Sequence, residues 1–304
     1  MADPAIVPES YRVVPDFFSR AAELRGEYDA HFAEPGAATA RHFNWNYWHV
    51  PNLYTYLRSD PLAVFSPELF QVFLTRLSEW ATETLGLTVV TRPFLSLYVH
   101  GCEQALHNDS ANGQRGWVYS LTRWDASSFD GGETLLFDEL TDYVRSPRQA
   151  REGAGFCRRI PPRFNQLLVF DDRVIHSVAR VHGSLDPLRG RVVLHGHLRP
   201  GPPAVTGKLS REEAVAVVEE GYSRLETRLA RHDGCQGVIA LRLAVARGGE
   251  VTGTRVLTAG LRPTTRDGSD DVTVTREVVR WAERLRFPRG PAKVTLSVDV
   301  AESD

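Results

Sequence analysis

The stretch LYVHGCEQALHNDSANG, residues 97–113, is the part of the sequence that is most informative about the fold of this chain. It predicts a strand that leads into the pair His107-x-Asp109. Side chains at positions i and i+2 of a strand point to the same face, so the imidazole and the carboxylate can converge on one metal ion. The pair alone is a weak signal, because His-x-Asp occurs often by chance.

A second histidine strengthens the prediction of a metal site. His176 lies at the end of the hydrophobic stretch LLVFDDRVIHSV, residues 167–178. Two histidines and one carboxylate on one face of an octahedral ion leave three positions open, which suits non-haem Fe(II) binding a bidentate 2-oxo acid and O₂. Such a co-substrate needs a cation for its far carboxylate. Arg191, which opens the run RVVLHGHL, is suited to this because a guanidinium bonds a carboxylate bidentately.

Residues on either side of this stretch predict the rest of the fold. From Leu87 to about Leu198, short β-rich runs follow one another without intervening helices, which favours an antiparallel sandwich or barrel. Before them, helical spacing of apolar residues over 15–32 and 66–86 predicts a mainly helical N-terminal region.

The segment 42–60 is unusually rich in aromatic residues and includes Trp48. Two interpretations remain open. The segment could be a strand-like flap that buries its rings on the sheet behind it. Alternatively, it could be a lid that faces the substrate, where rigid aromatic side chains such as Trp48 supply contact area at low entropic cost.

We expect two domains. The first spans 1–200, with helical support over 1–86 and a β core over 87–200. The run RPGPPAVTG, residues 199–207, is rich in proline and glycine and predicts a linker. Residues 208–304 then predict a small α+β module.

Local signals define the elements of this module. A Ser-x-x-Glu capping box opens a predicted helix over 210–234. Two strands follow, then a short helix over 276–285 and a last strand over 292–300.

Composition excludes several classes of protein. The chain has 304 residues, of which 42% are hydrophobic and 24% charged, and a formal net charge of −2, as expected for a soluble globular protein. This charge gives no support for binding to nucleic acid or to a membrane surface. With three cysteines, a disulfide scaffold or a four-cysteine zinc site is excluded. No secretory signal or long apolar run is visible, so we expect a cytoplasmic location.

Three segments together resemble a known family, the Fe(II)- and 2-oxoglutarate-dependent dioxygenases, in their prolyl-4-hydroxylase-like branch. The resemblance covers about residues 90–200. Its segments are Tyr98 with Gly101 and His107-Asn108-Asp109; YSLTRWDASSFDGGETLLF (119–137), which contains the turn Gly131-Gly132-Glu133; and Leu168–Asp171 leading to His176-Ser177-Val178, with Arg191 downstream.

The resemblance implies both a fold and a reaction. The fold would be a double-stranded β-helix, or jelly roll, whose mouth holds Fe(II) on His107, Asp109 and His176. Arg191 would bind 2-oxoglutarate, and Tyr98 or Tyr119 would assist with its carboxylates. With O₂ as oxidant, such a dioxygenase hydroxylates an unactivated C–H bond and releases succinate and CO₂, and ascorbate can support the reaction.

The resemblance also bears on the outcome of the reaction and on the choice of arginine. Related halogenases have glycine or alanine at the carboxylate position, so Asp109 implies hydroxylation or desaturation. Arg189 competes with Arg191, but strand parity favours Arg191, which would share a face with His195 and His197. These two histidines are either substrate contacts or hydrogen-bonded core residues.

Residues 237–300 are similar, more faintly, to the C-terminal domain of TonB-like energy transducers. The matching positions are Gly237-Val238, Gly249-x-Val251, Val256-Leu257, Trp281 and Phe287-Pro288. A transmembrane anchor and a proline-rich spacer are missing, so energy transduction is not implied. The module could pack on the first domain, form a homodimer, or capture an extended peptide at an edge strand.

For the substrate, the branch and the aromatic segment favour a peptidyl or amino-acid-derived molecule, while a natural-product intermediate stays open. The alternative to an enzyme is a catalytically silent protein that responds to iron or 2-oxoglutarate and engages a partner through its C-terminal module.

Overall fold

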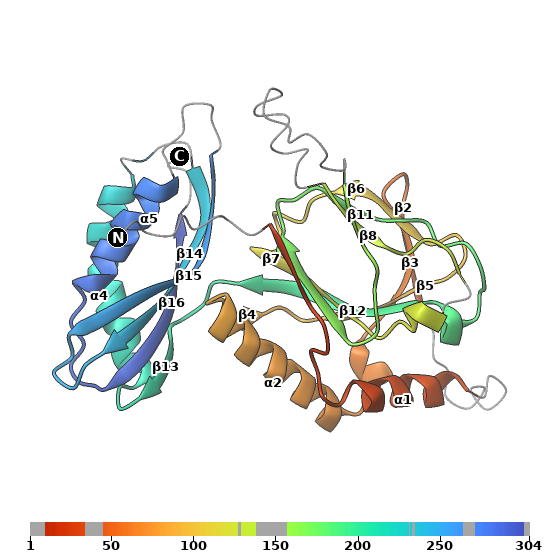
Figure 1. Ribbon diagram of the computed structural model, residues 1–304, viewed down its shortest axis with the longest axis horizontal. Coiled ribbons are helices and arrows are strands. Elements are labelled where there is room, and N and C mark those ends of the chain that lie inside the picture. The colour runs from red at the N-terminus through yellow and green to blue at the C-terminus, as the bar shows by residue number, and fades with distance from the viewer. Residues whose placement is uncertain are drawn as a thin grey trace. The chain divides into compact units, whose positions relative to one another are not determined.

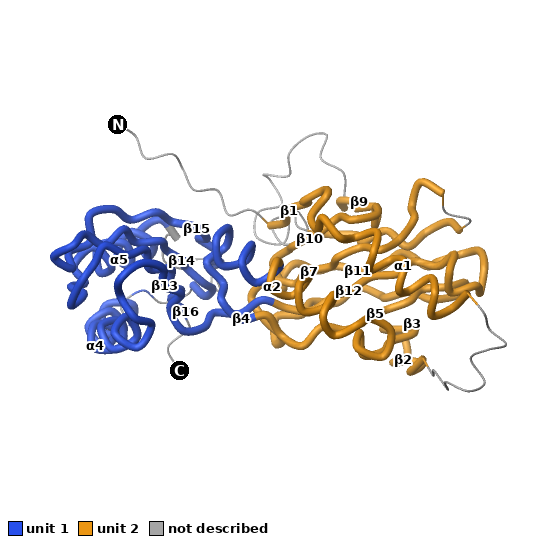
Figure 2. The backbone as a smooth tube through the Cα atoms, turned by 90° about the horizontal axis from the view of Figure 1, so that it is seen from below, with its two compact units in different colours: residues 1–9, 77–89, 198–304 blue, residues 10–76, 90–197 orange. Residues whose placement is uncertain are grey.

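The computed structural model divides the chain into two compact units, which are described separately here (Figure 2). The β unit comprises residues 10–76 and 90–197, and the C-terminal unit comprises the described residues within 77–89 and 198–304. The residues that the structure describes are 10–33, 45–126, 129–137, 157–230, 232, 235–263 and 271–300.

The β unit is built on a 12-stranded sheet that curls on itself (Figure 1). The strand order is β1-β10-β7-β12-β5-β3-β6-β11-β8-β9, with β2 paired to β3 and β4 to β12. Strand β3 pairs with β5 through residues 57–59 and with β6 through residues 54–55, so the sheet bends at this strand. The strands are β1 (Tyr11–Val14), β2 (Asn46–Val50), β3 (Tyr54–Ser59), β4 (Val89–Val90), β5 (Phe94–Tyr98), β6 (Glu103–His107), β7 (Arg115–Ser120), β8 (Thr134–Leu136), β9 (Arg158–Ile160), β10 (Gln166–Asp171), β11 (His176–Val178) and β12 (Arg191–Arg199).

The N-terminal region is less helical than the sequence predicts. Its α-helices are α1 (Ala21–Phe32) and α2 (Pro67–Thr84), but β1, β2 and β3 also lie in this region and belong to the sheet. The predicted helix over 15–32 begins late because Asp16 adopts a positive φ of 49°, which an α-helix does not accommodate. In β3, the side chains alternate between the two faces of the sheet, a period of two rather than 3.6.

One face of the sheet is covered by aromatic packing from α2. Phe73, which is fully buried, lies 4.7 Å from Tyr119 and 6.2 Å from Trp117, measured between ring centroids. A Cβ on Gly196 would lie 3.2 Å from the Trp117 ring, so this face of β12 also lies against Trp117. Residues of alternate parity on β12, which include Arg191, therefore lie on the opposite face of the sheet.

The C-terminal unit contains a four-stranded antiparallel sheet in the order β13-β16-β14-β15, with α4 and α5 on one side of it (Figure 1). Its apolar core joins the two helices to the strands. The predicted capping box at Ser210 is confirmed, as is the predicted last strand. The elements are β13 (Ala204–Gly207), α4 (Arg211–Leu229), β14 (Cys235–Val245), β15 (Val251–Pro263), α5 (Asp271–Glu283) and β16 (Ala292–Val300).

The segment predicted as a linker, 199–207, differs from expectation in its second half. Ala204–Gly207 is strand β13, and it pairs with residues 292–295 of β16. Ala204 and its neighbours follow the last proline of the run, so their backbone N–H groups are free to join a sheet.

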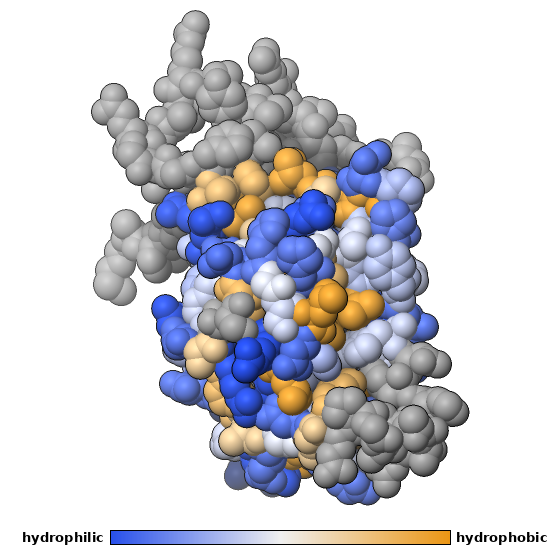
Figure 3. Space-filling view, turned by 90° about the vertical axis from the view of Figure 1, so that its right-hand side faces the viewer, coloured by the Kyte–Doolittle hydropathy of each residue, from blue (hydrophilic) through white to orange (hydrophobic). Residues whose placement is uncertain are grey.

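None of the helices within the described residues is long and apolar enough to cross a membrane. On the face of the molecule drawn in Figure 3, apolar residues form small separate groups among hydrophilic ones. Scattered apolar groups of this kind are normal for a protein surface.

Candidate metal centre

Two strands of the curled sheet place His107 and His176 side by side. His107 is the last residue of β6 and His176 the first of β11, and the two are partners in the antiparallel register. Their ring centroids are 4.2 Å apart. Asp109 lies two residues beyond the end of β6, and the ligand atoms of all three residues lie within 4.8 Å of one another. The structure therefore brings together the three side chains predicted to bind a metal.

Both imidazoles are oriented by backbone carbonyls. Nδ1 of His107 lies 2.7 Å from the carbonyl oxygen of Ala105, and Nδ1 of His176 lies 2.9 Å from that of Val174. Because a carbonyl only accepts, each Nδ1 carries a proton, and Nε2 of each ring is the nitrogen left for a metal. Metal-bound histidines generally have such a partner on the other nitrogen. Burial, followed by the neighbouring His176, lowers the pKa of His107, which favours the neutral form that a metal needs.

Asp109 is held by its own loop and by the turn that follows β10. Its backbone N–H donates to the carbonyl of Asp172 at 2.8 Å, and the side-chain amide of Asn112 donates to Oδ1 at 3.1 Å. Oδ2 lies 3.5 Å from Nε2 of His176. Burial raises the pKa of Asp109, but its interactions with the surrounding histidines outweigh burial and hold the pKa at about 2. Asp109 is thus a carboxylate at neutral pH, and Oδ2 faces the histidine pair.

A buried arginine lies on the same sheet. Arg191 opens β12, is 1% exposed, and stands opposite Tyr98 in the register of β5. Its Nη2 donates to Oγ1 of Thr134 at 3.3 Å, whereas its buried Nε and Nη1 have no hydrogen-bond partner within the described part of the chain. The side chain of Arg189 is 66% exposed and lies 3.7 Å from Asp186. Of the two candidate arginines, Arg191 is the one that offers unpaired donors in the interior.

The structure does not bring Tyr119 to this group. Its side chain lies on the α2 face of the sheet, 6.0 Å from Phe17 between ring centroids, and its hydroxyl donates to Oδ1 of Asn165 at 2.8 Å. Of the two tyrosines predicted to assist with a carboxylate, this placement favours Tyr98 over Tyr119. The alternation of side chains along a strand explains this placement, because Tyr119 and Trp117 share the face opposite to that of Arg191.

His195 and His197 share the face of Arg191, as strand parity predicts, and each has a polar partner. Nε2 of His195 lies 2.8 Å from Oγ of Ser96, and Nδ1 of His197 lies 3.0 Å from Oδ2 of Asp172. Burial, followed by the charges of His197 and Arg191, lowers the pKa of His195 to about 3. His195 is therefore neutral at physiological pH.

Asp172 is a member of the site that sequence reasoning missed. Asp109, Asp172 and His197 also have ligand atoms within 4.8 Å of one another. Burial raises the pKa of Asp172, while the hydrogen bond with His197 opposes this shift. Asp172 thus connects His197 to the loop that holds Asp109. Its side chain is fully buried, and only the fold reveals this.

Two tyrosines of β3 were also missed. Tyr54 lies edge-on to His107 at 5.1 Å, and Tyr56 stacks on Tyr98 at 5.1 Å with 9° between the ring planes. The alternation in YTYLRS carries the signal that could have found them, because it puts Tyr54, Tyr56 and Arg58 on one face of a strand.

Trp48 lies on the exposed strand β2, opposite Tyr56 in the register. The guanidinium of Arg58 lies 3.9 Å from the Trp48 ring and 3.8 Å from the Phe94 ring, so it is held between the two. Trp48 is 38% exposed, and neighbouring Tyr47 is 65% exposed. This strand of the aromatic segment therefore does not bury its rings, in contrast to the first of the two interpretations of residues 42–60.

Comparison with known proteins finds no match for the sequence, but it finds solved structures that are similar to this one. No family model and no curated protein matches the sequence. Among solved structures, a prolyl-4-hydroxylase from Pseudomonas putida is 19% identical, with 62% of this chain and 92% of that chain covered and a TM-score of 0.42. A prolyl hydroxylase from Trichoplax adhaerens, solved with a hypoxia-inducible-factor peptide fragment, is 14% identical, with 61% and 81% covered and a TM-score of 0.43. SnoN, a non-haem α-ketoglutarate-dependent epimerase of nogalamycin biosynthesis, is 14% identical, with 64% and 80% covered and a TM-score of 0.44.

These structural neighbours are prolyl-4-hydroxylases and other 2-oxoglutarate-Fe(II) oxygenases. The assignment of a function rests on the side chains described above.

Proposed function

We propose that this protein is an Fe(II)- and 2-oxoglutarate-dependent oxygenase that hydroxylates an unactivated C–H bond and releases succinate and CO₂. One observation carries the proposal: His107, Asp109 and His176 bring their ligand atoms within 4.8 Å, on the same curled sheet that buries an arginine with unpaired donors. The proposal includes a double-stranded β-helix as the fold of the β unit.

The donor set fits the metal. Two imidazoles and one carboxylate, with no thiolate, are the ligands that favour non-haem Fe(II) with open positions. His107 and His176 would bind it through Nε2, since Nδ1 of each is engaged by a backbone carbonyl. Asp109 would bind it through its ionised carboxylate. The bound iron, together with 2-oxoglutarate and O₂, supplies the oxidising chemistry.

The buried guanidinium fits the co-substrate. Arg191 keeps its charge at neutral pH, and a buried cation without an anionic partner is costly. A carboxylate of 2-oxoglutarate would accept hydrogen bonds from Nε and Nη1, which are otherwise unpaired. Tyr98, whose ring faces this guanidinium, and Thr134, which already accepts from Nη2, would fix its orientation. Arg191 is therefore the residue that selects a 2-oxo acid with a second carboxylate.

We infer that the substrate approaches from the side of β2 and β3. Trp48 offers an exposed aromatic surface, and Arg58 offers a cation held between two rings. An aromatic ring and a fixed guanidinium suit a peptidyl or amino-acid-derived molecule that carries an anionic group. His195 lies on the same face, and its neutral imidazole could accept or donate one hydrogen bond.

The test is turnover of 2-oxoglutarate to succinate with added Fe(II), comparing wild type with Asp109→Ala. A host peptide extract and an amino-acid pool serve as substrate sources, and mass spectrometry reports a +16 product. The matched control is Asp125→Ala, because that carboxylate is 77% exposed and outside the cluster. If iron fails to bind and no pool supports succinate formation, the proposal is wrong.

The competing function is a catalytically silent protein that binds iron or 2-oxoglutarate and acts through its C-terminal unit. The same assay separates the two functions. A silent protein would bind Fe(II) and 2-oxoglutarate through Asp109 and Arg191 without forming succinate above the Asp109→Ala background.

A further inference from the structure

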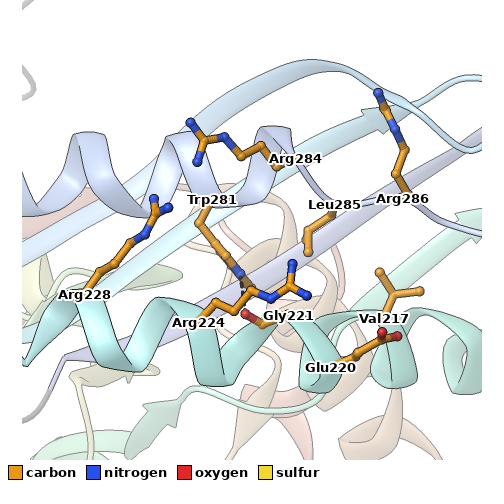
Figure 4. Close-up of a pocket in the computed structure, with 9 residues that line it drawn as sticks. All are labelled: Val217, Glu220, Gly221, Arg224, Arg228, Trp281, Arg284, Leu285 and Arg286. Atoms are coloured by element: carbon orange, nitrogen blue, oxygen red, sulfur yellow. Dashed lines mark hydrogen bonds between the residues drawn. The ribbon is translucent and has the colours of Figure 1, made fainter.

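The C-terminal unit contains a cavity of about 300 Å³ that the metal centre does not explain. It lies between α4 and α5, and Figure 4 shows side chains from both helices around it. Its charged lining consists of Arg224, Arg228, Arg284 and Arg286 against one carboxylate, Glu220. The cavity is therefore strongly cationic in a chain whose net charge is close to zero.

The floor of the cavity is apolar and fixed. Trp281 is 6% exposed, and its Nε1 donates to the carbonyl of Gly221 at 2.9 Å, the contact drawn as a dashed line in Figure 4. A Cβ at Gly221 would lie 2.9 Å from Leu285 and 3.1 Å from the indole nitrogen, so glycine permits this close approach of the two helices. Leu285 and Val217 complete the apolar lining.

The arginines are mostly without partners. Arg228 lies 3.6 Å from Glu277. Arg224, Arg284 and Arg286 form no ion pair with any residue in the described part of the chain, and all three are exposed. Arg224 and Arg228 are also one helical turn apart, and like charges at this spacing destabilise a helix. Figure 4 shows the Arg224 side chain lying in the gap between the helices, with its guanidinium end near Leu285.

Helix electrostatics accounts for only part of this cluster. Cations near the C-terminal end of a helix interact favourably with its dipole, and this applies to Arg228 in α4 and Arg284 after α5. It does not account for Arg224 and Arg228 reaching into the gap between the helices, over a rigid aromatic floor, with Arg284 and Arg286 also in the lining. Guanidiniums bond phosphate and carboxylate groups bidentately, and an apolar floor suits the organic part of such a ligand.

We propose that this cavity binds a small organic oxyanion, one that carries a phosphate or several carboxylates on an apolar body. Arg224 would contact the anionic group, with Arg228 also in the gap and Arg284 and Arg286 at the rim, and the apolar body would lie on Trp281 and Leu285. The volume is at the lower end of the range for small-molecule pockets, which favours a ligand of this size over a polymer. The proposal does not depend on the metal centre.

The test is calorimetric titration of the full chain with two probes, phenyl phosphate and citrate, at low and at moderate salt. The variants are Arg224→Gln and the double variant Arg224→Gln/Arg284→Gln. The control is Arg276→Gln, an exposed arginine of α5 that does not line the cavity. We expect saturable binding of at least one probe, a loss of roughly ten-fold in affinity for Arg224→Gln, and a change below about two-fold for Arg276→Gln.

The two probes distinguish the two sources of the anion, since a phosphate site prefers phenyl phosphate and a carboxylate site prefers citrate. Circular dichroism and thermal unfolding verify that each variant is folded. The proposal is overturned if neither probe saturates, or if the Arg224→Gln and Arg276→Gln variants bind alike. Binding of hexaglutamate without binding of either small probe would also overturn it, in favour of an acidic peptide segment.

Discussion

The guanidinium carbon of Arg191 lies 4.5 Å from the centroid of the Tyr98 ring, and the two residues are direct partners across β12 and β5. The position of the Arg191 guanidinium is thus set by the register of two central strands and not by a flexible loop. Tyr98 is in turn stacked on Tyr56, so the arginine is supported by two successive rings. A site of this kind is rigid before any ligand binds, which lowers the entropic cost of binding.

Arg191→Ala should raise the KM for 2-oxoglutarate by roughly 100-fold, because it removes two charge-assisted hydrogen bonds. Arg189→Ala is the control, since that side chain is 66% exposed, and its KM should change little. Succinate formation at varied 2-oxoglutarate measures both. A larger effect for Arg189→Ala than for Arg191→Ala would reverse the assignment.

Asp109→Ala should lower succinate formation at least about 100-fold, because even the loss of a residue that only supports a metal ligand commonly costs 10- to 100-fold. The variant should also bind less than one equivalent of iron under conditions where wild type binds one. Metal analysis after desalting checks this. Asp125→Ala should retain full iron content, and equal iron in both variants would remove Asp109 from the ligand set.

The stability of the metal-free protein should fall with decreasing pH partly through His195. Its folded pKa of about 3 lies below the unfolded value of 6.5, so the unfolded chain binds more protons between these values. The contribution of neutral His195 to the free energy of unfolding is complete above pH 6.5 and is lost as the pH falls toward 3. Between pH 7 and pH 5, urea unfolding should show wild type losing roughly 1 to 2 kcal/mol more than His195→Gln. Identical losses would mean that His195 is accessible to protons in the fold.

Trp48→Ala should leave the slow turnover of 2-oxoglutarate without substrate unchanged, because Trp48 does not touch the metal cluster or Arg191. The extra turnover stimulated by the active peptide or amino-acid fraction should fall about ten-fold, as expected for the loss of an aromatic contact. Leu62→Ala is a suitable control, since Leu62 is also an exposed apolar residue, at 55%. Equal stimulation in wild type and Trp48→Ala would place the substrate elsewhere.

Gly131→Ala should destabilise the β unit by about 3 kcal/mol or more. Gly131 has a φ of +79°, and a Cβ there would lie 1.9 Å from the carbonyl oxygen of Arg180, a backbone atom that cannot move aside easily. Thermal unfolding measures the loss. Gly26→Ala is the control, because a Cβ at that helical position meets nothing within 4 Å, and it should be neutral or stabilising.

Sequence reasoning predicted the three candidate metal ligands because part of their signal is local. His107 and Asp109 are two residues apart at the end of β6 and just beyond it, and His176 follows a hydrophobic run, so the sequence pattern placed all three near strand ends. Strand parity placed Arg191, His195 and His197 on one face. Parity applied to β7 would also have separated Tyr119 from this group, but only if the pairing of β7 with β12 had been known.

The sequence by itself therefore determined the candidate ligand types, the strand face of Arg191 and the capped helix at Ser210, all of which depend on neighbours along the chain. Only the tertiary structure decided which residues from distant segments of the chain contact one another. It placed Tyr54 against His107, Asp172 against His197, and the arginines of α4 beside those that follow α5. Such contacts depend on strand register and helix packing between distant segments, and no local pattern encodes them.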